Sequence, residues 1–323
     1  MSKTLVINIG VLAALLVWFS FATSGFMTLE NQTNLIRQVS FVGISACAVT
    51  PVMVAGGLDL SVGATVAISG VSAALLVAHV GWPLWLAFVL GALIGGAVGA
   101  VNAFLVVGMR INPVIATLGT LYVGRGLANV LSGGSPVTGV PLAFDNLATA
   151  FVAHIPVPVL VFAIFAAALI VIERKTLLGR WVIASGGNQE AARLAGIPVS
   201  RTRAIFYVVS GLAAGVTGIL INSRIATGDP NSGIGFEFSV IVAVVLGGTA
   251  ITGGQGNIIG SIIGVLIIGC LDNGLNLMGV NSFYQDIILG IALVFAVGLG
   301  EVLRGSWRSL SFISGPLNAF RHR

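Results

Sequence analysis

The chain has 323 residues, of which 57% are hydrophobic and only 8% are charged. An ordinary water-soluble domain carries about 25% charged residues, and a surface with so little charge would expose apolar patches large enough to aggregate. The composition therefore excludes a soluble globular domain and indicates an integral membrane protein, in line with a mean hydropathy of +1.07. The 44 glycines suit helices that pack closely through small residues in a bilayer. With so few charged residues, the net charge of +5 reports membrane topology and not a nucleic-acid partner.

Apolar runs long enough to cross a bilayer recur along the whole chain. One crossing needs about 20 mostly apolar residues, so these runs predict an all-α fold, a polytopic membrane helical bundle with about ten transmembrane spans. The expected spans are residues 5–21, 39–55, 60–80, 84–107, 113–131, 155–172, 204–221, 238–251, 258–277 and 287–302. The fifth of them is weaker and rich in glycine, so it either spans the membrane or re-enters it.

No water-exposed domain interrupts these spans, and residues 1–323 are expected to form a single transmembrane domain. The longest polar interval is a loop at about 173–203, and a polar tail follows at about 304–323. The first span resembles a signal peptide, because Lys3 precedes its apolar stretch. Since further spans follow it, an uncleaved membrane anchor is the preferred interpretation.

Positive charge is distributed unevenly over the predicted loops. If the N-terminus is cytoplasmic, twelve of the fifteen Lys and Arg residues fall on the cytoplasmic side, as the positive-inside rule requires. These twelve are Lys3, Arg110, Arg174, Lys175, Arg180, Arg193, Arg201, Arg203, Arg304, Arg308, Arg321 and Arg323. The outer loops keep only Arg37 and Arg224, and Arg125 lies within the fifth span. Both termini are therefore expected in the cytoplasm.

Two glycine-rich segments, 56–63 and 247–254, each lie between apolar runs. Interrupted helices in duplicated halves are frequent in transporters, where the substrate path runs between the repeats, although chance similarity in a glycine-rich chain is an equal alternative. Both segments are expected to break a helix and to act in gating. The residues assigned to these breaks are Gly56, Gly57, Asp59, Ser61, Gly63, Gly247, Gly248, Gly253 and Gly254.

Asp59 and Arg125 are the ionisable residues that stand out within apolar surroundings, where a charge is costly without a partner or water. Asp59 either has a direct functional role or, together with Ser61, caps a half-helix that starts at Leu60. Arg125 lies among glycines, and we expect it to pair with freed backbone carbonyls or with an acid from another helix.

The polar loop contains a candidate partner-binding helix in residues 186–198. Asn188 is a possible N-cap, Glu190 and Arg193 complement the helix dipole, and Gly196 stands just past the end. A helix of two turns buries too little surface to be stable alone. We therefore expect it to dock on a partner through Asn188, Glu190, Ala191, Arg193 and Gly196, with a plain loop as the alternative.

No motif in the sequence indicates catalysis or nucleotide binding. A P-loop does not occur, so ATP would have to be bound by another subunit. The three histidines, His79, His154 and His322, are scattered without ligands at metal-binding spacing. Cys47 and Cys270 lie within apolar runs and are expected to be core residues.

The ordered set of motifs resembles the membrane permease subunits of ribose-type monosaccharide ATP-binding-cassette importers, over about residues 34–302. Each motif alone is weak, but the series is specific. The matching segments are 56–63 (GGLDLSVG), 112–113 (NP), 116–120 (ATLGT), 125–127 (RGL), 178–180 (LGR), 188–197, Pro230, 233–237 (GIGFE), 247–249 (GGT), 253–256 (GGQG) and 273–276 (NGLN). Phe238-Ser239 and Ala250-Ile251 depart from the family pattern, which leaves the identity of the sugar open.

The resemblance implies a bacterial inner-membrane importer in which this chain does no catalysis. Its partners would be a second permease subunit, identical or paralogous, two cytoplasmic ATPase subunits that hold ATP and Mg²⁺, and a periplasmic sugar-binding protein. ATP-driven closure would push the 188–197 helix and rock the bundle around a central path. Candidates for that path are Asn112, Thr117, Arg125, Asn273 and Asn276, and Arg37 and Arg224 are candidates for docking the binding protein.

Two further classes of transporter remain open at this point. Related importers of nucleosides or branched-chain amino acids share the glycine-rich helical style, although the 59–63 pattern favours the sugar branch. A stand-alone secondary transporter or channel would need coupling charges at the midplane and no docking helix. A membrane enzyme is disfavoured because no cluster of acid, base and nucleophile occurs.

Overall fold

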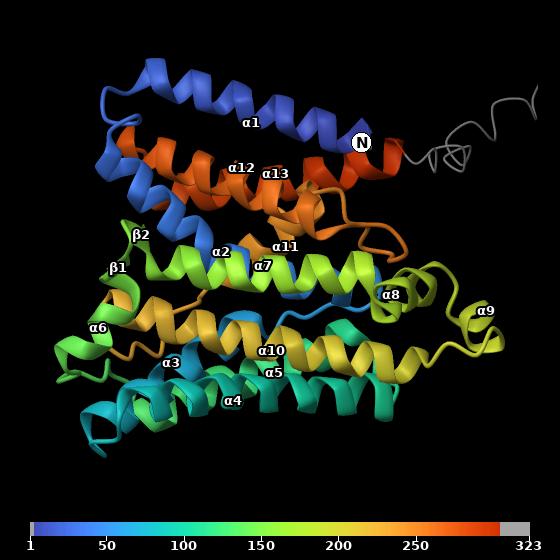
Figure 1. Cartoon of the computed structure of the whole chain (residues 1–323), viewed down its shortest axis with the longest axis horizontal. Helices are drawn as coiled ribbons and strands as arrows, with labels where there is room; N and C mark the ends of the chain where they lie inside the picture. The colour runs from blue at the N-terminus through green and yellow to red at the C-terminus, as the bar shows by residue number, and fades with distance from the viewer. Residues whose placement is uncertain (1–2, 304–323) are drawn as a thin grey trace, which may run out of the picture.

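The computed structural model describes residues 3–303, and these form a bundle of long helices that lie roughly parallel in Figure 1. The only sheet in this range is a short hairpin of β1 (Phe151–Val152) and β2 (Ile155–Pro156). The predicted tail at 304–323 lies outside the described residues. The helices are α1 (Lys3–Ala22), α2 (Leu29–Val54), α3 (Val62–Ala78), α4 (Leu84–Ala103), α5 (Pro113–Ser132), α6 (Leu142–Thr149), α7 (Val157–Lys175), α8 (Leu177–Gly187), α9 (Gln189–Leu194), α10 (Val199–Arg224), α11 (Phe236–Leu246), α12 (Ile258–Leu277) and α13 (Ser282–Leu303), with one π-helical turn, η1 (Phe104–Gly108), after α4.

Each of the ten expected spans corresponds to one of these helices, which confirms the predicted fold class. Seven helices in the described range are long and apolar enough to cross a membrane: α1, α2, α4 with η1, α5, α7, α10 and α12. Their outer faces carry exposed apolar side chains, such as Phe21 at 88% and Trp18 at 64% exposure. Lipid is the solvent that such a surface requires. The chain is therefore a multi-pass membrane protein.

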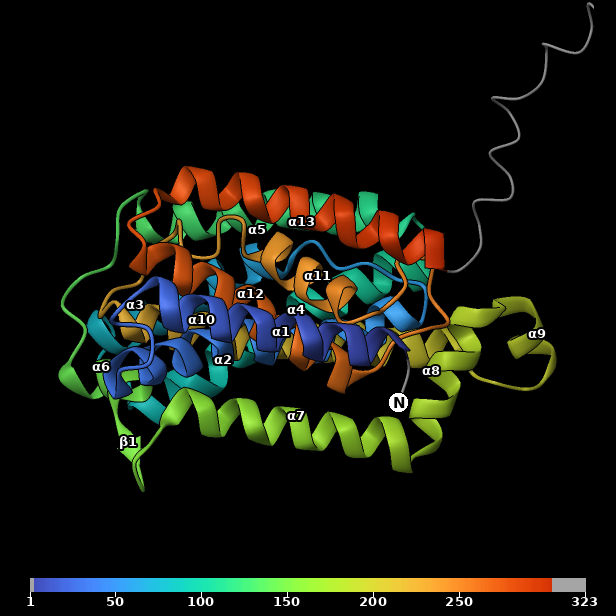
Figure 2. The ribbon, with the colours of Figure 1, turned by 90° about the horizontal axis from the view of Figure 1, so that it is seen from above.

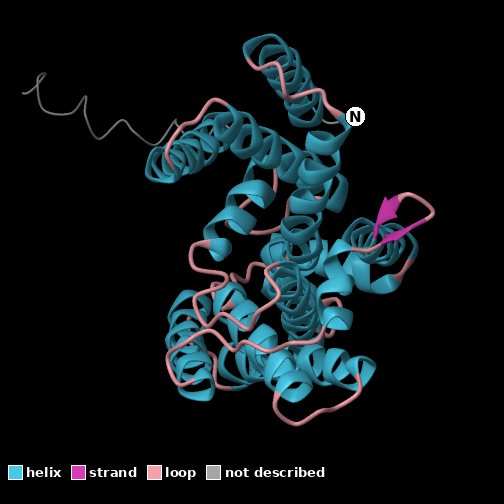
Figure 3. Cartoon of the chain, turned by 90° about the vertical axis from the view of Figure 1, so that its left-hand side faces the viewer, coloured by secondary structure: helices cyan, strands magenta, loops and turns pink. Residues whose placement is uncertain are grey.

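The two ends of the bundle differ in character. One end, which we call the hairpin end, carries β1, β2 and α6, and the other, the α9 end, carries α8 and the protruding α9 (Figures 1 and 2). The end-on view of Figure 3 shows the hairpin standing beside the bundle. The N-terminus of α1 and the last turn of α13 both lie at the α9 end (Figure 1).

The centre of the bundle is formed by α2 and α10, each of 26 residues. α10 packs on α4, α3 and α2, and its tightest contact is with α4. Gly91, Gly95 and Gly99 of α4, four residues apart, face Gly211 and Gly215 of α10, and a Cβ atom on Gly95 would meet the Gly211 carbonyl oxygen. Small residues at this spacing let two helix backbones approach closely in lipid. This glycine face fixes α4 against α10.

The structure corrects the expected lengths of two spans. The eighth, expected at 238–251, is an 11-residue helix, α11, which ends at Leu246 before Gly247 and Gly248 and is too short to cross a bilayer. The third starts at Val62 and not at Leu60, which leaves α3 with 17 residues. Hydropathy alone misses both effects because the interrupting residues are themselves apolar or small.

The structure also shows which helices form in the fifth expected span and in the polar loop. α5 is a continuous helix of 20 residues that starts at Pro113 and ends before Gly133, whose φ of 65° is the left-handed conformation that favours glycine. The segment is therefore one continuous helix, long and apolar enough to span, with no break that would let it re-enter. The loop at 173–203 contains the expected short helix, α9, but also α8, which the sequence analysis did not predict.

Candidate functional site

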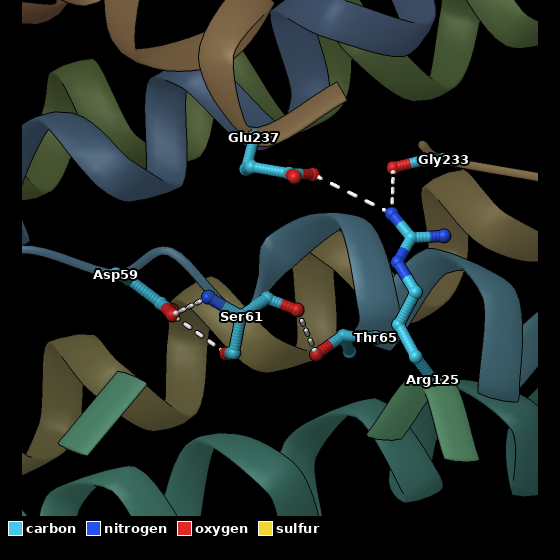
Figure 4. Close-up of polar contacts among 6 residues, drawn as sticks. All are labelled: Asp59, Ser61, Thr65, Arg125, Gly233 and Glu237. Atoms are coloured by element: carbon cyan, nitrogen blue, oxygen red, sulfur yellow. Dashed lines mark hydrogen bonds and ion pairs between the residues drawn. The ribbon is translucent and has the colours of Figure 1, made fainter. Parts of the chain in front are cut away.

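The first glycine-rich break, residues 55–61, turns around the buried carboxylate of Asp59, which is 2% exposed. Its Oδ1 accepts hydrogen bonds from the Ser61 amide at 3.1 Å and from the Ser61 hydroxyl at 2.7 Å (Figure 4). Its Oδ2 accepts from the hydroxyl of Ser210 on α10 at 2.7 Å. Buried charged or polar groups must be hydrogen-bonded to be tolerated. Asp59 thus ties the break to α10.

Asn102 of α4 extends the hydrogen bonds around Asp59 to two further helices. Its amide nitrogen donates to the Ser61 hydroxyl oxygen at 2.7 Å and, more weakly, to Asp59 at 3.4 Å. Its carbonyl oxygen accepts from Thr120 of α5 at 2.7 Å. We call Asp59, Ser61, Asn102, Thr120 and Ser210 the Asp59 network. It joins the start of α3 to α4, α5 and α10.

The predicted capping arrangement is half right. Asp59 does accept a free backbone amide at the start of the helix, that of Ser61. Ser61 itself, however, occupies the N-cap position of α3 and makes no side-chain cap hydrogen bond. Its hydroxyl is instead engaged by Asp59 and Asn102. Ser61 therefore serves as a link within the Asp59 network and not as a cap.

The second break, residues 247–257, is held by backbone geometry. Gly248, Gly253 and Gly254 adopt φ values of 94°, 88° and 77°, a region that only glycine enters without strain. The Ala250 amide donates to the Gln255 carbonyl at 2.9 Å. α12 then begins with Asn257 as its N-cap, whose side chain accepts from the Gly260 amide at 2.7 Å.

The two breaks touch each other near the α9 end of the bundle. The Gly254 amide donates to the Val54 carbonyl at 2.8 Å. A Cβ atom on Gly253 would come within 2.9 Å of Gly56, and one on Gly186 of α8 would meet both Val54 and Gly254. α8 therefore packs directly on the junction of the two breaks.

Arg125 connects α5 to the start of α11. Its Nη2 donates to the Gly233 carbonyl at 2.7 Å and lies 3.7 Å from the Glu237 carboxylate (Figure 4). Both kinds of partner that the sequence predicted, a freed carbonyl and an acid from another helix, are present. The Glu237 carboxylate also packs on Gly63 of α3, where a Cβ atom would collide with it. The starts of α3 and α11 thus meet at this ion pair.

A cavity of about 670 Å³ opens toward the hairpin end between α2, α10, α11, α12 and α13. Its wall combines aromatic rings with hydrogen-bonding side chains, some of them positively and some negatively charged. The polar lining residues are Gln38, Arg224, Ser239, Asp272 and Asp286, and the aromatic ones are Phe41, Phe236 and Phe238. A mostly apolar wall with a few placed polar groups is typical of a small-molecule site.

α9 projects from the opposite end of the bundle with the cap geometry expected from the sequence. The Asn188 side chain accepts from the amides of Glu190 and Ala191, both at 3.0 Å. Gly196, just past the end, has a φ of 79°. Leu194 is 87% exposed, whereas Ala192 is buried at 5%. The helix thus presents an apolar side chain outward while one face rests on the bundle.

Comparison with known proteins identifies the family. The family described as branched-chain amino acid transport system / permease component matches residues 31–297. The chain is 40% identical to the ribose import permease protein of Bacillus subtilis (strain 168) over 285 residues, covering 88% of each protein. It is 38% identical to the L-arabinose ABC transporter permease protein of Azospirillum brasilense over 308 residues, covering 93% of this chain and 89% of that protein. No solved structure matches the chain.

The chain belongs to this permease family. The Escherichia coli (strain K12) ribose import permease protein, 38% identical over 293 residues, covers 88% of this chain. These matches confirm the resemblance to ribose-type permeases that the motif series indicated. They also identify the protein as a transport component, and they disfavour a stand-alone secondary transporter.

The permease does not bring the expected path residues together. Asn112 caps α5, where its side chain accepts from the Val114 amide at 2.9 Å. Thr117 is buried and donates to the Pro113 carbonyl at 2.8 Å. Asn273 of α12 exchanges two hydrogen bonds of 2.9 Å with Asn31 of α2. None of these three lines the 670 Å³ cavity, and neither do Arg125 and Asn276. Their assignment to the path stays a prediction.

The two outer arginines of the permease take different positions at the hairpin end. Arg37 lies over the Phe151 ring of the hairpin, 5.3 Å from its centroid. Arg224 lines the 670 Å³ cavity. Arg224 makes no ion pair with its neighbours Asp229 or Glu237, because the one ion pair among the described residues joins Arg125 to Glu237. Docking of a binding protein through Arg37 and Arg224 stays a prediction.

Most of the residues that line the permease's cavity are not among the residues predicted from the sequence. Asp272 is one position before Asn273, the amide that the sequence motif contains. Gln38 and Asp286 lie one position before the expected spans 39–55 and 287–302, so a search confined to the spans does not reach them. Asp272 lies inside the expected span 258–277, and the rule that singles out intramembrane ionisable residues applies to it as it does to Asp59 and Arg125.

Proposed function

We propose that this permease is the membrane subunit of an ATP-driven importer and forms the translocation path for a monosaccharide of the ribose, xylose or galactose kind. The observation that carries the proposal is the 35–40% identity, over most of the chain, to curated permeases named for ribose, D-allose and L-arabinose. An importer of nucleosides or branched-chain amino acids is the alternative, since the family description names the latter.

The working importer would contain several chains. We infer a second permease, identical or paralogous, two ATPase subunits on the cytoplasmic face, and a periplasmic sugar-binding protein. The permease sequence has no P-loop, so ATP and Mg²⁺ would be held by the ATPase subunits. The permease would contribute the path and its gates, and no cofactor of its own.

The α9 end is proposed to face the cytoplasm. α7 ends there with Arg174 and Lys175 in its last turn, and Arg110 and Arg193 lie in the neighbouring turns. The positive-inside rule assigns such a concentration of cations to the cytoplasmic side. Both termini would then be cytoplasmic, and the hairpin end would meet the binding protein.

α9 is proposed to contact an ATPase subunit. It is capped, protrudes at the cytoplasmic end and exposes Leu194, which a partner would cover. A cysteine at the exposed Ala191 should crosslink to the ATPase in the assembled importer, whereas a cysteine at the buried Ala192 should not. Crosslinks to lipid or to the permease alone at every exposed position of α9 would refute the contact.

The 670 Å³ cavity is proposed as part of the sugar path near the hairpin end. Sugar hydroxyls require both donors and acceptors, which Gln38, Ser239 and Asp272 would supply, and an apolar sugar face can pack on the ring of Phe238. Asp272→Asn should raise the apparent KM for sugar uptake in liposomes. Asp145→Asn, an acid of α6 outside the cavity, is the matched control and should leave uptake unchanged.

The decisive test of the function is transport by the reconstituted complex. The permease, the ATPase and the binding protein encoded with it should together take up the sugar that the binding protein binds, and uptake should require ATP hydrolysis. Screening sugars, nucleosides and branched-chain amino acids against that binding protein separates the proposal from its alternative. Uptake by the permease alone, without an ATPase, would contradict the proposed function.

Arg224 is proposed to help orient the arriving binding protein, since charges across an interface steer encounter more than they add affinity. Arg224→Glu should slow association of the binding protein with liposomes, and a reversed acid on that protein should restore it. The effect should fade in salt, where charges are screened beyond about 10 Å. If the association rate changes neither with Arg224→Glu nor with salt, Arg224 lines the cavity and does not orient the binding protein.

A further inference from the structure

A second cavity, of about 540 Å³, lies at the α9 end between the turn that joins η1 to α5 and the turn that joins α9 to α10. Three arginines line it: Arg110, Arg193 and Arg203. The remaining polar residues of its wall are Asn112, Gln189 and Ser200, and no Asp or Glu is among the lining residues. The cavity therefore concentrates positive charge without any acid to balance it.

The arginines themselves lack anionic partners. The one ion pair among the described residues is Arg125–Glu237, far along α5 from this cavity. Arg203 makes a weak hydrogen bond of 3.5 Å from Nη2 to the Gly56 carbonyl, and its buried Nε has no hydrogen-bond partner. A buried donor left unpaired is costly.

Two long helices also point their N-termini at this cavity. α5 begins at Pro113 and α10 at Val199, and both residues are in the cavity wall. The residue before α10 is Pro198, which provides no side-chain cap, and the Ser200 amide has no acceptor among the described residues. The partial positive charge and free amides of a helix N-terminus favour phosphate and other anions.

The backbone at the rim of the cavity is unusual. Arg110 has a φ of 58°, in the left-handed region, which is unfavourable for a residue with a side chain. It lies two residues after the end of the π-helical turn η1, with Met109 between them. Strained residues and π-helical turns occur often at functional sites. Here the strained conformation belongs to one of the three cavity arginines.

From these observations we infer that the α9-end cavity binds an anionic phosphate group. The guanidinium groups would contact its oxygens, and the Ser200 amide would complete the shell; arginine forks match phosphate geometry. The phosphate can come from an anionic phospholipid headgroup or from a free phosphorylated metabolite, since both occur on the side where the proposed orientation places this end. Because Gln189 and Arg193 belong to α9, the bound anion would also hold α9 against α10.

Binding is tested on the full-length permease, purified in an uncharged detergent, with pyrophosphate as the soluble probe. Titration calorimetry should show saturable binding that weakens at least tenfold in Arg110→Gln and in Arg193→Gln. Arg201→Gln removes an exposed cation in the same first turn of α10 that does not line the cavity, and it should change the affinity less than twofold. Thermal unfolding midpoints equal to that of the parent protein verify that the variants are folded.

The lipid source is tested in nanodiscs that contain phosphatidylglycerol and phosphatidylcholine in equal amounts. Native mass spectrometry should show phosphatidylglycerol retained by the parent protein and by Arg201→Gln, but lost from Arg110→Gln and Arg193→Gln. Variant-sensitive binding of pyrophosphate supports a soluble ligand, and variant-sensitive retention of the lipid supports a headgroup.

The inference is overturned if neither probe depends on Arg110 and Arg193, or if Arg201→Gln has an equal effect. It is also overturned if the two arginines become protected from chemical modification only when the ATPase subunit is added, because an acidic protein segment would then be the occupant. None of these assays requires transport, so their outcome is independent of the proposed sugar import.

Discussion

The two breaks in the bundle are built in different ways. At residues 55–61 side chains hold the chain in place: the Asp59 carboxylate and Asn102 together bind α3, α4, α5 and α10. At residues 247–257 the turn depends on glycines with positive φ and on backbone hydrogen bonds. The hydroxyl of Thr249, although buried, has no hydrogen-bond partner there.

This difference indicates which part of the permease is fixed and which can move. Local stability follows from buried contacts and satisfied hydrogen bonds. The first break is fastened to α4 and α10, which are themselves packed glycine on glycine. The second leads from the short α11 into α12, two helices that also line the large cavity closer to the hairpin end.

The largest effect is expected from removing the Asp59 carboxylate. Asp59→Leu strands three donors, the amide and hydroxyl of Ser61 and the hydroxyl of Ser210, each at about 1–3 kcal/mol, so the total loss should be about 3 kcal/mol or more and little folded permease should reach the membrane. Asp59→Asn keeps one acceptor and should cost less than about 1.5 kcal/mol. Thermal unfolding in detergent and membrane levels measure both. Equal, severe loss of transport in both variants at normal membrane levels would instead indicate a step that needs the charge.

The next-largest effect is expected from disturbing the glycine face between α4 and α10, the helices that carry Asn102 and Ser210. Gly95→Leu forces α4 away from the α10 backbone and should cost about 1–3 kcal/mol, with loss of the Asp59 network as well. Gly119→Leu on α5 is the matched control, because nothing lies within 4 Å of its Cβ position. If both variants lower the unfolding temperature equally, close packing of α4 on α10 does not stabilise the first break.

The second break should be sensitive to replacement of a glycine and insensitive to loss of a side-chain hydroxyl. Gly253→Ala places a side chain at a φ of 88° and close to Gly56, which should cost about 1–2 kcal/mol. Thr249→Val removes a hydroxyl that bonds to nothing, and stability should be unchanged or slightly higher. A strongly destabilising Thr249→Val would show that side-chain hydrogen bonds hold this break too.

The smallest effect is expected at the α9 end, outside both breaks. Asn188→Ala removes the cap of α9, worth about 0.5–2 kcal/mol locally, and global unfolding should be unaffected. Hydrogen exchange of the Glu190 and Ala191 amides should accelerate, and less sugar should be transported for each ATP hydrolysed. Asn188→Asp retains the cap and should behave as the parent protein. Unchanged exchange in Asn188→Ala would show that docking on the bundle, and not the cap, keeps α9 helical.

Local patterns carried most of what the sequence predicted correctly. The apolar runs identified the ten helical segments, and Asn188 with Gly196 predicted α9, because caps act over a few residues. Partners distant in the chain were not predictable: Ser210 is 151 positions from Asp59, and only the packing of α10 on α4 brings it there. The sequence predicted the kind of partner for Arg125 but not that it would be Glu237.

Hydropathy also fails where a helix stops inside an apolar stretch. The end of α11 at Leu246 depends on the backbone angles of Gly247 and Gly248, which composition does not report. The cavity was missed for a related reason. Its lining residues come from five helices and from the loop between α10 and α11, and each contributes only a few of them, so no single segment carries the pattern.

The contrast between the breaks is tested most directly by hydrogen exchange of the assembled importer in nanodiscs, without nucleotide and with ATP trapped. The amides of residues 57–61 should exchange at the same slow rate, within twofold, in both states. The exchange rates of the amides of residues 248–256 should differ at least tenfold between the two states. A change at 57–61 equal to or larger than the change at 248–256 would contradict the account.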